Sequence, residues 1–276
     1  MKQSVSNIAW SPGERFDAYA LLANHNVDGL EIAPGLAFPD LNRPFDATDA
    51  DVRDFLRSIQ KHELVLTSMQ SLLFGTSGAA LFGDGMARAR FREGIEAAIR
   101  LAGRLRIPNL VLGSPKNRLI PEDMESAEAR EIWLDMFCRL GDEAARVGTV
   151  VALEANPTEY GTNFLTTVAQ TIDAVKACAH PAVTLNLDLG ALLLTGEIDR
   201  LYELGEQEIG LISHVHISSP HLKPIGPSHK GIAEMLGLAD RAGVWPSVEM
   251  TGGLVALEET LNFLGGFYPV VDSHPK

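Results

Sequence analysis

The stretch Val150-Val151-Ala152-Leu153-Glu154-Ala155-Asn156-Pro157 is the starting point for interpreting this chain. Its apolar, β-branched first half is typical of a buried strand, and the Asn-Pro pair that follows cannot continue a helix or a central strand. The sequence therefore predicts a strand that carries a carboxylate, Glu154, at its C-terminal tip.

Three later stretches repeat this pattern of a short apolar strand with a metal-ligand residue at or near its end. Residues 183–190 contain Asp188, residues 212–217 contain His216, and residues 245–250 contain Glu249. A segment long enough for a helix separates each stretch from the next. Such alternation of strands and helices favours a parallel sheet.

The same alternation extends over the rest of the sequence. Further strands are expected at residues 5–10, 27–33, 64–69 and 109–113. Helices are expected at residues 16–26, 49–59, 86–105, 121–147, 166–179, 192–204, 229–242 and 254–263. Eight strand-helix units predict a single (β/α)8 TIM barrel domain over residues 1–276, although an open doubly wound sheet has similar periodicity. The long Gly-rich connection at residues 71–85 is of the kind that often covers a site.

Composition narrows the class of function. The chain has 276 residues, of which 46% are hydrophobic, and its 23 basic against 36 acidic residues give a net charge of −13. This charge repels polyphosphate, so we expect a small substrate and no nucleic-acid partner. Cys138 and Cys178 have no metal-binding or redox spacing, and no apolar run approaches the ~18 residues of a membrane span. With no signal peptide at the start, the expectation is a cytoplasmic protein without a membrane partner.

Side-chain parity indicates that the four metal-ligand residues converge. Alternate residues of a strand point to opposite faces, and in each of the four strands the apolar set has the parity opposite to the ligand residue. The apolar sets suit the strand-helix interface, which leaves Glu154, Asp188, His216 and Glu249 facing the barrel axis. Their position at the C-terminal strand ends is where barrel enzymes carry their sites.

A divalent cation is the expected occupant of this cluster. Three carboxylates in a dry pocket repel one another, and a bound cation relieves that repulsion. Carboxylate-rich ligation with one imidazole suits Mn²⁺ best, with Mg²⁺, Co²⁺ or Zn²⁺ as alternatives. A single acid at a strand end is more commonly a loop cap or ion-pair partner, so the prediction rests on the set of four.

At these residues the chain resembles the xylose isomerase-like barrel superfamily, which holds sugar and sugar-phosphate isomerases and epimerases, inosose dehydratases and the endonuclease IV group. The resemblance spans nearly the whole chain. It implies that Glu154, Asp188, His216 and Glu249 bind a divalent metal. It further implies a sugar or sugar-phosphate isomerase or epimerase in which Glu154 and Glu249 exchange a proton through a metal-stabilised enediolate.

The chain departs from the epimerase pattern at two positions. Epimerases of free ketoses tend to carry a substrate-contacting His three residues after the metal-binding Asp, where this chain has Ala191. The Arg that such enzymes place shortly after the seventh-strand His is also not evident here. The identity of the substrate therefore does not carry over from the resemblance.

Six further residues are candidates for contact with a substrate: Glu31, Gln70, Lys116, Arg118, Asn156 and His229. Lys116 and Arg118 follow the fourth strand, where they can hold a phosphate or carboxylate or else form an exposed, solvated pair. Glu31 and Gln70 are candidate hydroxyl contacts, for which a structural hydrogen-bonding role is the alternative. His229 is a candidate to fill space left by the missing residues.

Other functions remain open at this point. A metal-dependent dehydratase can use the same cation to expel a hydroxyl group, and a non-catalytic barrel can bind a sugar without chemistry. An endonuclease of the endonuclease IV type needs more histidines and a basic groove, which the net charge of −13 disfavours. The expected partner is a small carbohydrate or sugar phosphate, and a homo-oligomer is possible.

Overall fold

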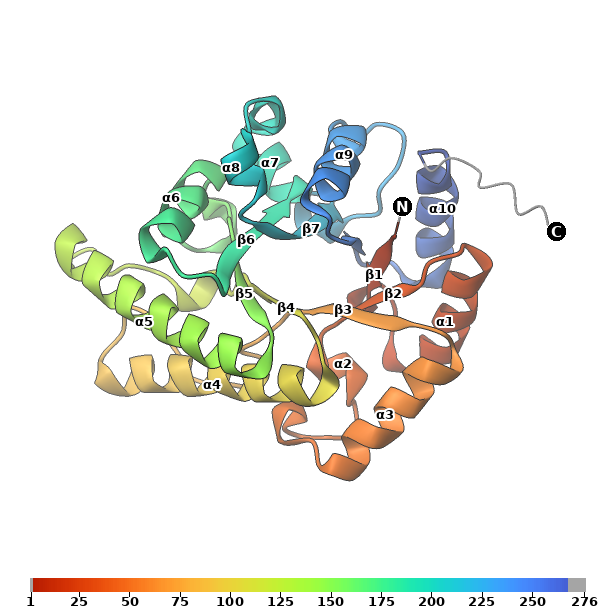
Figure 1. Ribbon diagram of the computed structural model, residues 1–276, viewed down its shortest axis with the longest axis horizontal. Coiled ribbons are helices and arrows are strands. Elements are labelled where there is room, and N and C mark those ends of the chain that lie inside the picture. The colour runs from red at the N-terminus through yellow and green to blue at the C-terminus, as the bar shows by residue number, and fades with distance from the viewer. Residues whose placement is uncertain (1, 268–276) are drawn as a thin grey trace.

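In the computed structural model, eight parallel strands close into a barrel in the order in which they occur along the chain (Figure 1). The strands are β1 Ser4–Ser6, β2 Gly29–Ile32, β3 Val65–Met69, β4 Asn109–Leu112, β5 Val150–Glu154, β6 Val183–Asp188, β7 Ile212–Ser218 and β8 Pro246–Glu249. The predicted TIM barrel is confirmed, and the closure between β1 and β8 rules out the open sheet. The structure describes residues 2–267. Residue 1 and residues 268–276, which the predicted domain includes, lie outside this description.

Helices surround the barrel (Figure 1). They are α1 Arg15–Asn24, α2 Pro34–Ala37, α3 Asp49–Lys61, α4 Gly85–Leu105, α5 Ser126–Val147, α6 Val168–Cys178, α7 Leu189–Thr195, α8 Glu206–Ile209, α9 Ile232–Ala242 and α10 Gly253–Gly265. The long helix α4 buries Phe91, Ile95, Ala98 and Ala102, whose spacing places them on one face. No helix among residues 2–267 is long and apolar enough to cross a membrane.

The interior of the barrel is unusually polar for a packed core. Ser4 and Thr67 join their hydroxyl groups at 2.8 Å, and Ser213 donates to Asn109 Oδ1 at 2.7 Å. A register shift between β6 and β7 lets Ser213 and His214 both take part in this interior. Because buried polar groups must find partners, these pairs link strands across the barrel below its C-terminal face.

The first strand is shorter than the sequence indicates. Residues 5–10 were expected to be extended, but β1 ends at Ser6 and Asn7–Ala9 form a 3-10 turn. The side chain of Asn7 accounts for the difference, because it accepts from Ala33 N at 2.7 Å and donates to Ala33 O at 3.3 Å. This side chain replaces a strand partner and fixes the loops that follow β1 and β2.

Three expected helices have different limits. The helix expected at 192–204 is α7, which begins at Leu189 and stops at Gly196, whose φ of 71° favours glycine. A separate 3-10 turn follows at Ile198–Tyr202. Helix α5 begins at Ser126 instead of residue 121, and α9 begins at Ile232 after Gly231, which has a φ of 83°. For α7, the turn at Gly196 overrides an apolar periodicity that continues past the helix.

The Gly-rich connection at residues 71–85 packs against the loop after β4. Leu81 N donates to Asn117 O at 2.8 Å, and Asn117 Nδ2 donates to Ala79 O at 2.6 Å. A cavity of about 520 Å³ lies between this connection, α4 and residues 42–46 on the outer side of the barrel. These contacts tie the connection to a rim loop, and its expected role as a cover stays a prediction.

Candidate metal centre and active site

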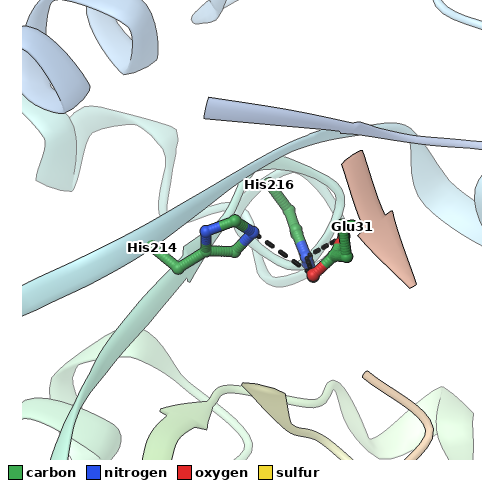
Figure 2. A group of neighbouring side chains, drawn as sticks. All are labelled: Glu31, His214 and His216. Carbon is green, nitrogen blue, oxygen red and sulfur yellow. Dashed lines mark hydrogen bonds and ion pairs between the residues drawn. The ribbon is translucent and has the colours of Figure 1, made fainter. Parts of the chain in front are cut away.

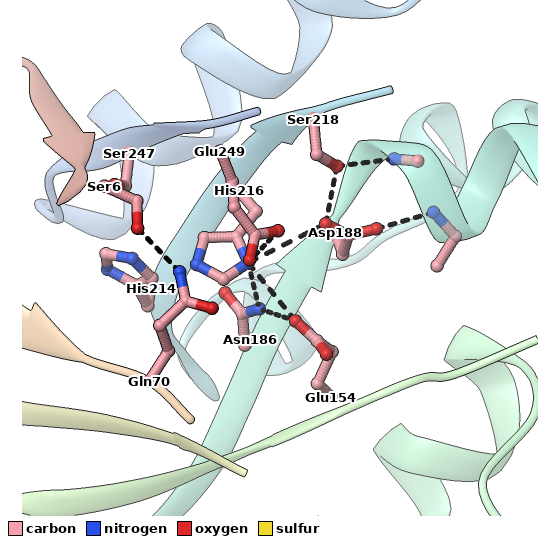
Figure 3. A network of polar contacts seen from close by, with 12 residues as sticks. Ser6, Gln70, Glu154, Asn186, Asp188, His214, His216, Ser218, Ser247 and Glu249 are labelled. Atoms are coloured by element: carbon pink, nitrogen blue, oxygen red, sulfur yellow. Dashed lines mark hydrogen bonds and ion pairs between the residues drawn. The ribbon is translucent and has the colours of Figure 1, made fainter. Parts of the chain in front are cut away.

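The four predicted ligand residues converge at the C-terminal ends of four adjacent strands (Figure 3). Glu154, Asp188 and Glu249 are the last residues of β5, β6 and β8, and His216 lies two residues before the end of β7. Strand register brings them together, since Asp188 pairs with His216 and Ser218 pairs with Glu249. We call Glu154, Asp188, His216 and Glu249 the quartet.

His216 Nδ1 is the point on which the three carboxylates converge. It lies 3.2 Å from Glu154 Oε1, 3.4 Å from Glu249 Oε2 and 3.7 Å from Asp188 Oδ2. One ligand atom each from Glu154, Asp188 and His216 lies within 4.8 Å of the others. Glu249 joins this group through its contact with His216, from the next strand.

The pKa values of Glu249, Asp188 and His216 are all raised, which reflects the crowding of negative charge in the quartet. Burial, together with the charges of Glu154 and Asp188, raises the pKa of Glu249 to about 8. Burial and the charge of Glu154 raise the pKa of Asp188 to about 6. Burial opposes the charge on His216, but the carboxylates of Glu249 and Glu31 outweigh it and hold the pKa of His216 well above its usual value.

This donor set fits a divalent cation. A cation at the quartet relieves the repulsion that keeps protons on Glu249 and Asp188. Carboxylate oxygens with one imidazole nitrogen are ligands that Mn²⁺, Mg²⁺, Co²⁺ and Zn²⁺ accept, and the chain places both cysteines elsewhere. The chemistry of the residues present is thus consistent with the resident metal expected from the sequence.

Asp188 is held in place through both of its oxygens. Oδ1 accepts from Ala191 N at 2.6 Å, which caps α7, and Oδ2 accepts from Ser218 Oγ at 2.5 Å. Ser218 Oγ in turn accepts from Gly190 N at 2.8 Å. Sequence reasoning missed Ser218, although its inward parity two residues after His216 was a usable signal.

Glu154 is held by amide groups on both sides. Asn186 Nδ2 donates to Oε1 and Asn156 Nδ2 donates to Oε2, each at 2.8 Å. Burial raises the pKa of Glu154, but hydrogen bonding and charge from His216, together with the Asn156 contact, outweigh it and lower the pKa. Gly113 faces this carboxylate so closely that an added Cβ would lie 2.6 Å from Oε2. Asn156, a predicted substrate contact, therefore has a supporting contact with the quartet.

Arg118 does not lie in an exposed position at the rim. Its side chain is fully buried and donates from Nη2 to Asn156 Oδ1 at 2.6 Å and to Glu154 O at 3.1 Å. Burial lowers its pKa to about 10, against the opposing charge of Glu154. Full burial contradicts both expectations for this residue, an anion-binding group at the mouth or an exposed and solvated side chain. Arg118 instead supports Asn156 through a hydrogen bond. Its neighbour Lys116 is exposed, beside Gly161 of the loop after β5.

Glu31 and Gln70 are linked to the quartet through His216 Nε2. Glu31 is fully buried, with its oxygens engaged by neighbouring side chains. Gln70 Nε2 donates to Ser6 Oγ at 2.7 Å and to Glu31 Oε2 at 3.4 Å. Burial raises the pKa of Glu31, but the charges of His216 and His214 outweigh it and keep the pKa well below its usual value. These positions favour the structural role that the sequence left open for both residues.

The loops after β5 and β7 meet over the barrel mouth. Tyr160 Oη accepts from His221 N at 3.1 Å, and the two rings pack edge to face with centroids 5.9 Å apart. Burial, then the charges of the quartet carboxylates, raises the pKa of Tyr160. His229, another predicted substrate contact, joins its Nε2 to Ser219 Oγ at 2.9 Å and its Nδ1 to the backbone of Gly226. The structure thus gives His229 a role in shaping the loop after β7.

Comparison with known proteins identifies similar sequences and folds. A family model described as xylose isomerase-like TIM barrel matches residues 19–264. No curated protein matches the chain. The solved structure of 3-keto-D-glucoside 4-epimerase from E. coli is similar, with a TM-score of 0.75 at 16% identity, over 97% of this chain and 98% of that one.

Two further solved structures resemble the chain. D-allulose 3-epimerase from Methylomonas sp., in complex with D-allulose, has a TM-score of 0.70 at 20% identity, over 91% of this chain and 84% of that one. AP endonuclease family 2 from Brucella melitensis has a TM-score of 0.69 at 19% identity, over 99% of this chain and 100% of that one. At these identities the likeness establishes the shared fold.

Proposed function

The chain belongs to the xylose isomerase-like TIM barrel family, and on that premise we propose that it is a divalent-metal-dependent sugar or sugar-phosphate isomerase or epimerase. The observation that supports this most strongly is the convergence of three carboxylates on His216 Nδ1 at the C-terminal face of the barrel. Two of the similar structures are sugar epimerases. The net charge of −13 disfavours the nucleic-acid substrate of the endonuclease branch.

The quartet would hold the cation, for which Mn²⁺ is our first choice, with Mg²⁺, Co²⁺ or Zn²⁺ as alternatives. When bound, it supplies positive charge that stabilises the oxyanion formed as a proton leaves the carbon next to a carbonyl. Asp188 is suited to ligation alone, because Ala191 N and Ser218 Oγ already occupy its two oxygens with hydrogen bonds.

Glu154 and Glu249 are the acid-base pair in this proposal. Glu154 is fixed by two amide donors, which orient its oxygens within the mouth. Glu249 has an ion-pair contact with His216 at 3.4 Å, and no hydrogen bond to it is found within residues 2–267. A base held in place and a less restrained acid can remove a proton and return it, and the carbon that receives it distinguishes isomerisation from epimerisation.

The test is exchange of a substrate C–H with solvent deuterium over a panel of ketoses and sugar phosphates. Glu154→Gln and Glu249→Gln are each expected to abolish exchange, since an amide cannot accept the proton. Glu258→Gln, an exposed acid on α10, is the matched control and should exchange normally. Normal exchange in both quartet variants would refute the assignment.

Product analysis separates the competing functions in the same experiment. A dehydratase loses water and produces a conjugated chromophore, which an isomerase or epimerase does not. A non-catalytic barrel binds a sugar without any exchange. The substrate itself is left open by Ala191, which stands where free-ketose epimerases tend to have a His.

A further inference from the structure

Glu31 reaches across the barrel to the imidazole of the quartet (Figure 2). It comes from β2, and β1 and β8 lie between that strand and β7 in the barrel. Both of its carboxylate oxygens lie 3.1 Å from His216 Nε2. The imidazole is therefore contacted on one edge by the quartet carboxylates and on the other by Glu31.

The carboxylate of Glu31 is itself held by a set of neighbours. Ser247 Oγ donates to Oε2 at 3.1 Å, and Gln70 Nε2 approaches the same oxygen at 3.4 Å. His214 Nε2 lies 3.3 Å from Oε1. Glu31 and both histidines are almost completely inaccessible to solvent, so this arrangement is built into the core and does not depend on a mobile surface chain.

The two nitrogens of the His216 ring need different protonation states. A cation at the quartet needs the lone pair of Nδ1, because that nitrogen faces Glu154, Asp188 and Glu249. A neutral imidazole then keeps its single N–H at Nε2. A carboxylate can only accept a hydrogen bond, so Glu31 satisfies that N–H and disfavours the opposite tautomer.

We propose that Glu31 is a positioning residue that fixes the tautomer and ring orientation of His216, so that Nδ1 presents its lone pair to the quartet. This inference rests on the proposed metal-dependent function. It assigns Glu31 a role in metal affinity, in place of the direct contact with a sugar hydroxyl considered from the sequence. Loss of a carboxylate that orients a metal-binding histidine typically lowers metal affinity about 10- to 100-fold.

A second cation is the rival explanation for the same group. Ligand atoms of Glu31, His214 and His216 lie within 4.8 Å of one another, a spacing that a metal ion also accepts. A cation there would require His216 to give up its Nε2 proton while Nδ1 serves the quartet. The number of bound cations per chain therefore separates the two explanations.

The test compares Mn²⁺ binding to metal-stripped wild type and Glu31→Gln, followed by the electron paramagnetic resonance signal of free Mn²⁺. We expect one Mn²⁺ per chain in both and a Kd about 10- to 100-fold higher in the variant. Glu197→Gln is the control, because Glu197 is a partly buried acid whose hydrogen bonds, accepted from Val168 N and Thr195 Oγ1, involve no residue of the quartet. An unchanged Kd in Glu31→Gln overturns the inference. Two cations in wild type, one of them lost in Glu31→Gln, also overturn it and make Glu31 a ligand.

A second measurement needs no variant of Glu31. In Mg²⁺-loaded wild type, ¹⁵N correlation spectra of the histidine side chains report which ring nitrogen carries the proton, with His216→Asn used to assign the signals. We expect the proton on Nε2, and a proton on Nδ1 would overturn the inference even if Glu31→Gln fails to fold. If wild type binds no divalent cation, the proposed function fails as well, which distinguishes that result from a failure of the Glu31 assignment alone.

Discussion

Arg118 donates from Nη2 to Asn156 Oδ1 at 2.6 Å, and Asn156 Nδ2 in turn donates to Glu154 Oε2 at 2.8 Å. A fully buried guanidinium thus supports a quartet carboxylate through one neutral side chain. Its Nε and Nη1 are buried with no hydrogen-bond partner found within residues 2–267. A buried charge with unmet donors is costly, so this residue serves the site more than it serves stability.

Replacing Arg118 should therefore affect function and stability differently. In Arg118→Met, loss of the contacts to Asn156 and Glu154 opposes relief of the buried charge, so the free energy of unfolding should change by less than about 2 kcal/mol. Deuterium exchange should fall about 10- to 100-fold, because Glu154 loses its support. Urea unfolding and exchange rates measure the two effects. Arg139→Met, which removes an exposed ion pair with Asp135, is the control expected to leave exchange unchanged. Wild-type exchange in Arg118→Met would refute the supporting role.

Gly113 is expected to tolerate no side chain. In Gly113→Ala the new Cβ would lie 2.6 Å from Glu154 Oε2, so the carboxylate must move. A misplacement of about 1 Å near the reacting atoms can cost about 100-fold in rate, and we expect a loss of this order. Gly85→Ala, where an added Cβ meets nothing within 4 Å, is the matched control. Equal exchange rates in the two variants would show that the position of Glu154 does not matter.

The metal-free protein should lose stability as pH rises. Burial, followed by neighbouring carboxylate charge, raises the pKa of Glu249 from 4.5 to about 8 and that of Asp188 from 3.8 to about 6. The folded state therefore keeps protons that the unfolded state has released. This stabilisation is fully present below the unfolded values and is lost as pH rises through about 6 and then about 8. The raised pKa of His216 acts in the same direction.

This pH dependence can be measured as Tm in EDTA between pH 5 and 9. Bound Mn²⁺ displaces the same protons, so its stabilising effect should grow with pH. Glu249→Gln should remove the part of the metal-free decline that ends near pH 8, the folded-state pKa of this group. A decline of equal size in that variant would assign it to other groups.

The sequence was most informative where a regular pattern met a rigid scaffold. Strand parity in β5 to β8 predicted that Glu154, Asp188, His216 and Glu249 lie together, because inward-pointing residues at the C-terminal ends of parallel barrel strands face the same mouth. Parity does not report depth or partners, so Glu31 was considered for contact with a sugar hydroxyl although it is fully buried. Arg118 was considered because it follows the fourth strand, and position in the sequence does not report burial either. Side chains that bond to distant backbone, such as Asn7 at the end of β1, cannot be located from local sequence either.

The central claim, that the quartet is a cation site, is tested most directly by titrating Mn²⁺ into metal-stripped protein and following Tm in wild type and Asp188→Asn. Asparagine keeps the cap on α7 while removing one ligand charge, so the variant should fold. We predict a clear rise in wild type, equivalent to about 2.7 kcal/mol at a 100-fold excess of Mn²⁺ over Kd, and a weak rise or none in the variant. No rise in wild type with Mn²⁺, Mg²⁺, Co²⁺ or Zn²⁺ would contradict the claim and leave a barrel without metal chemistry.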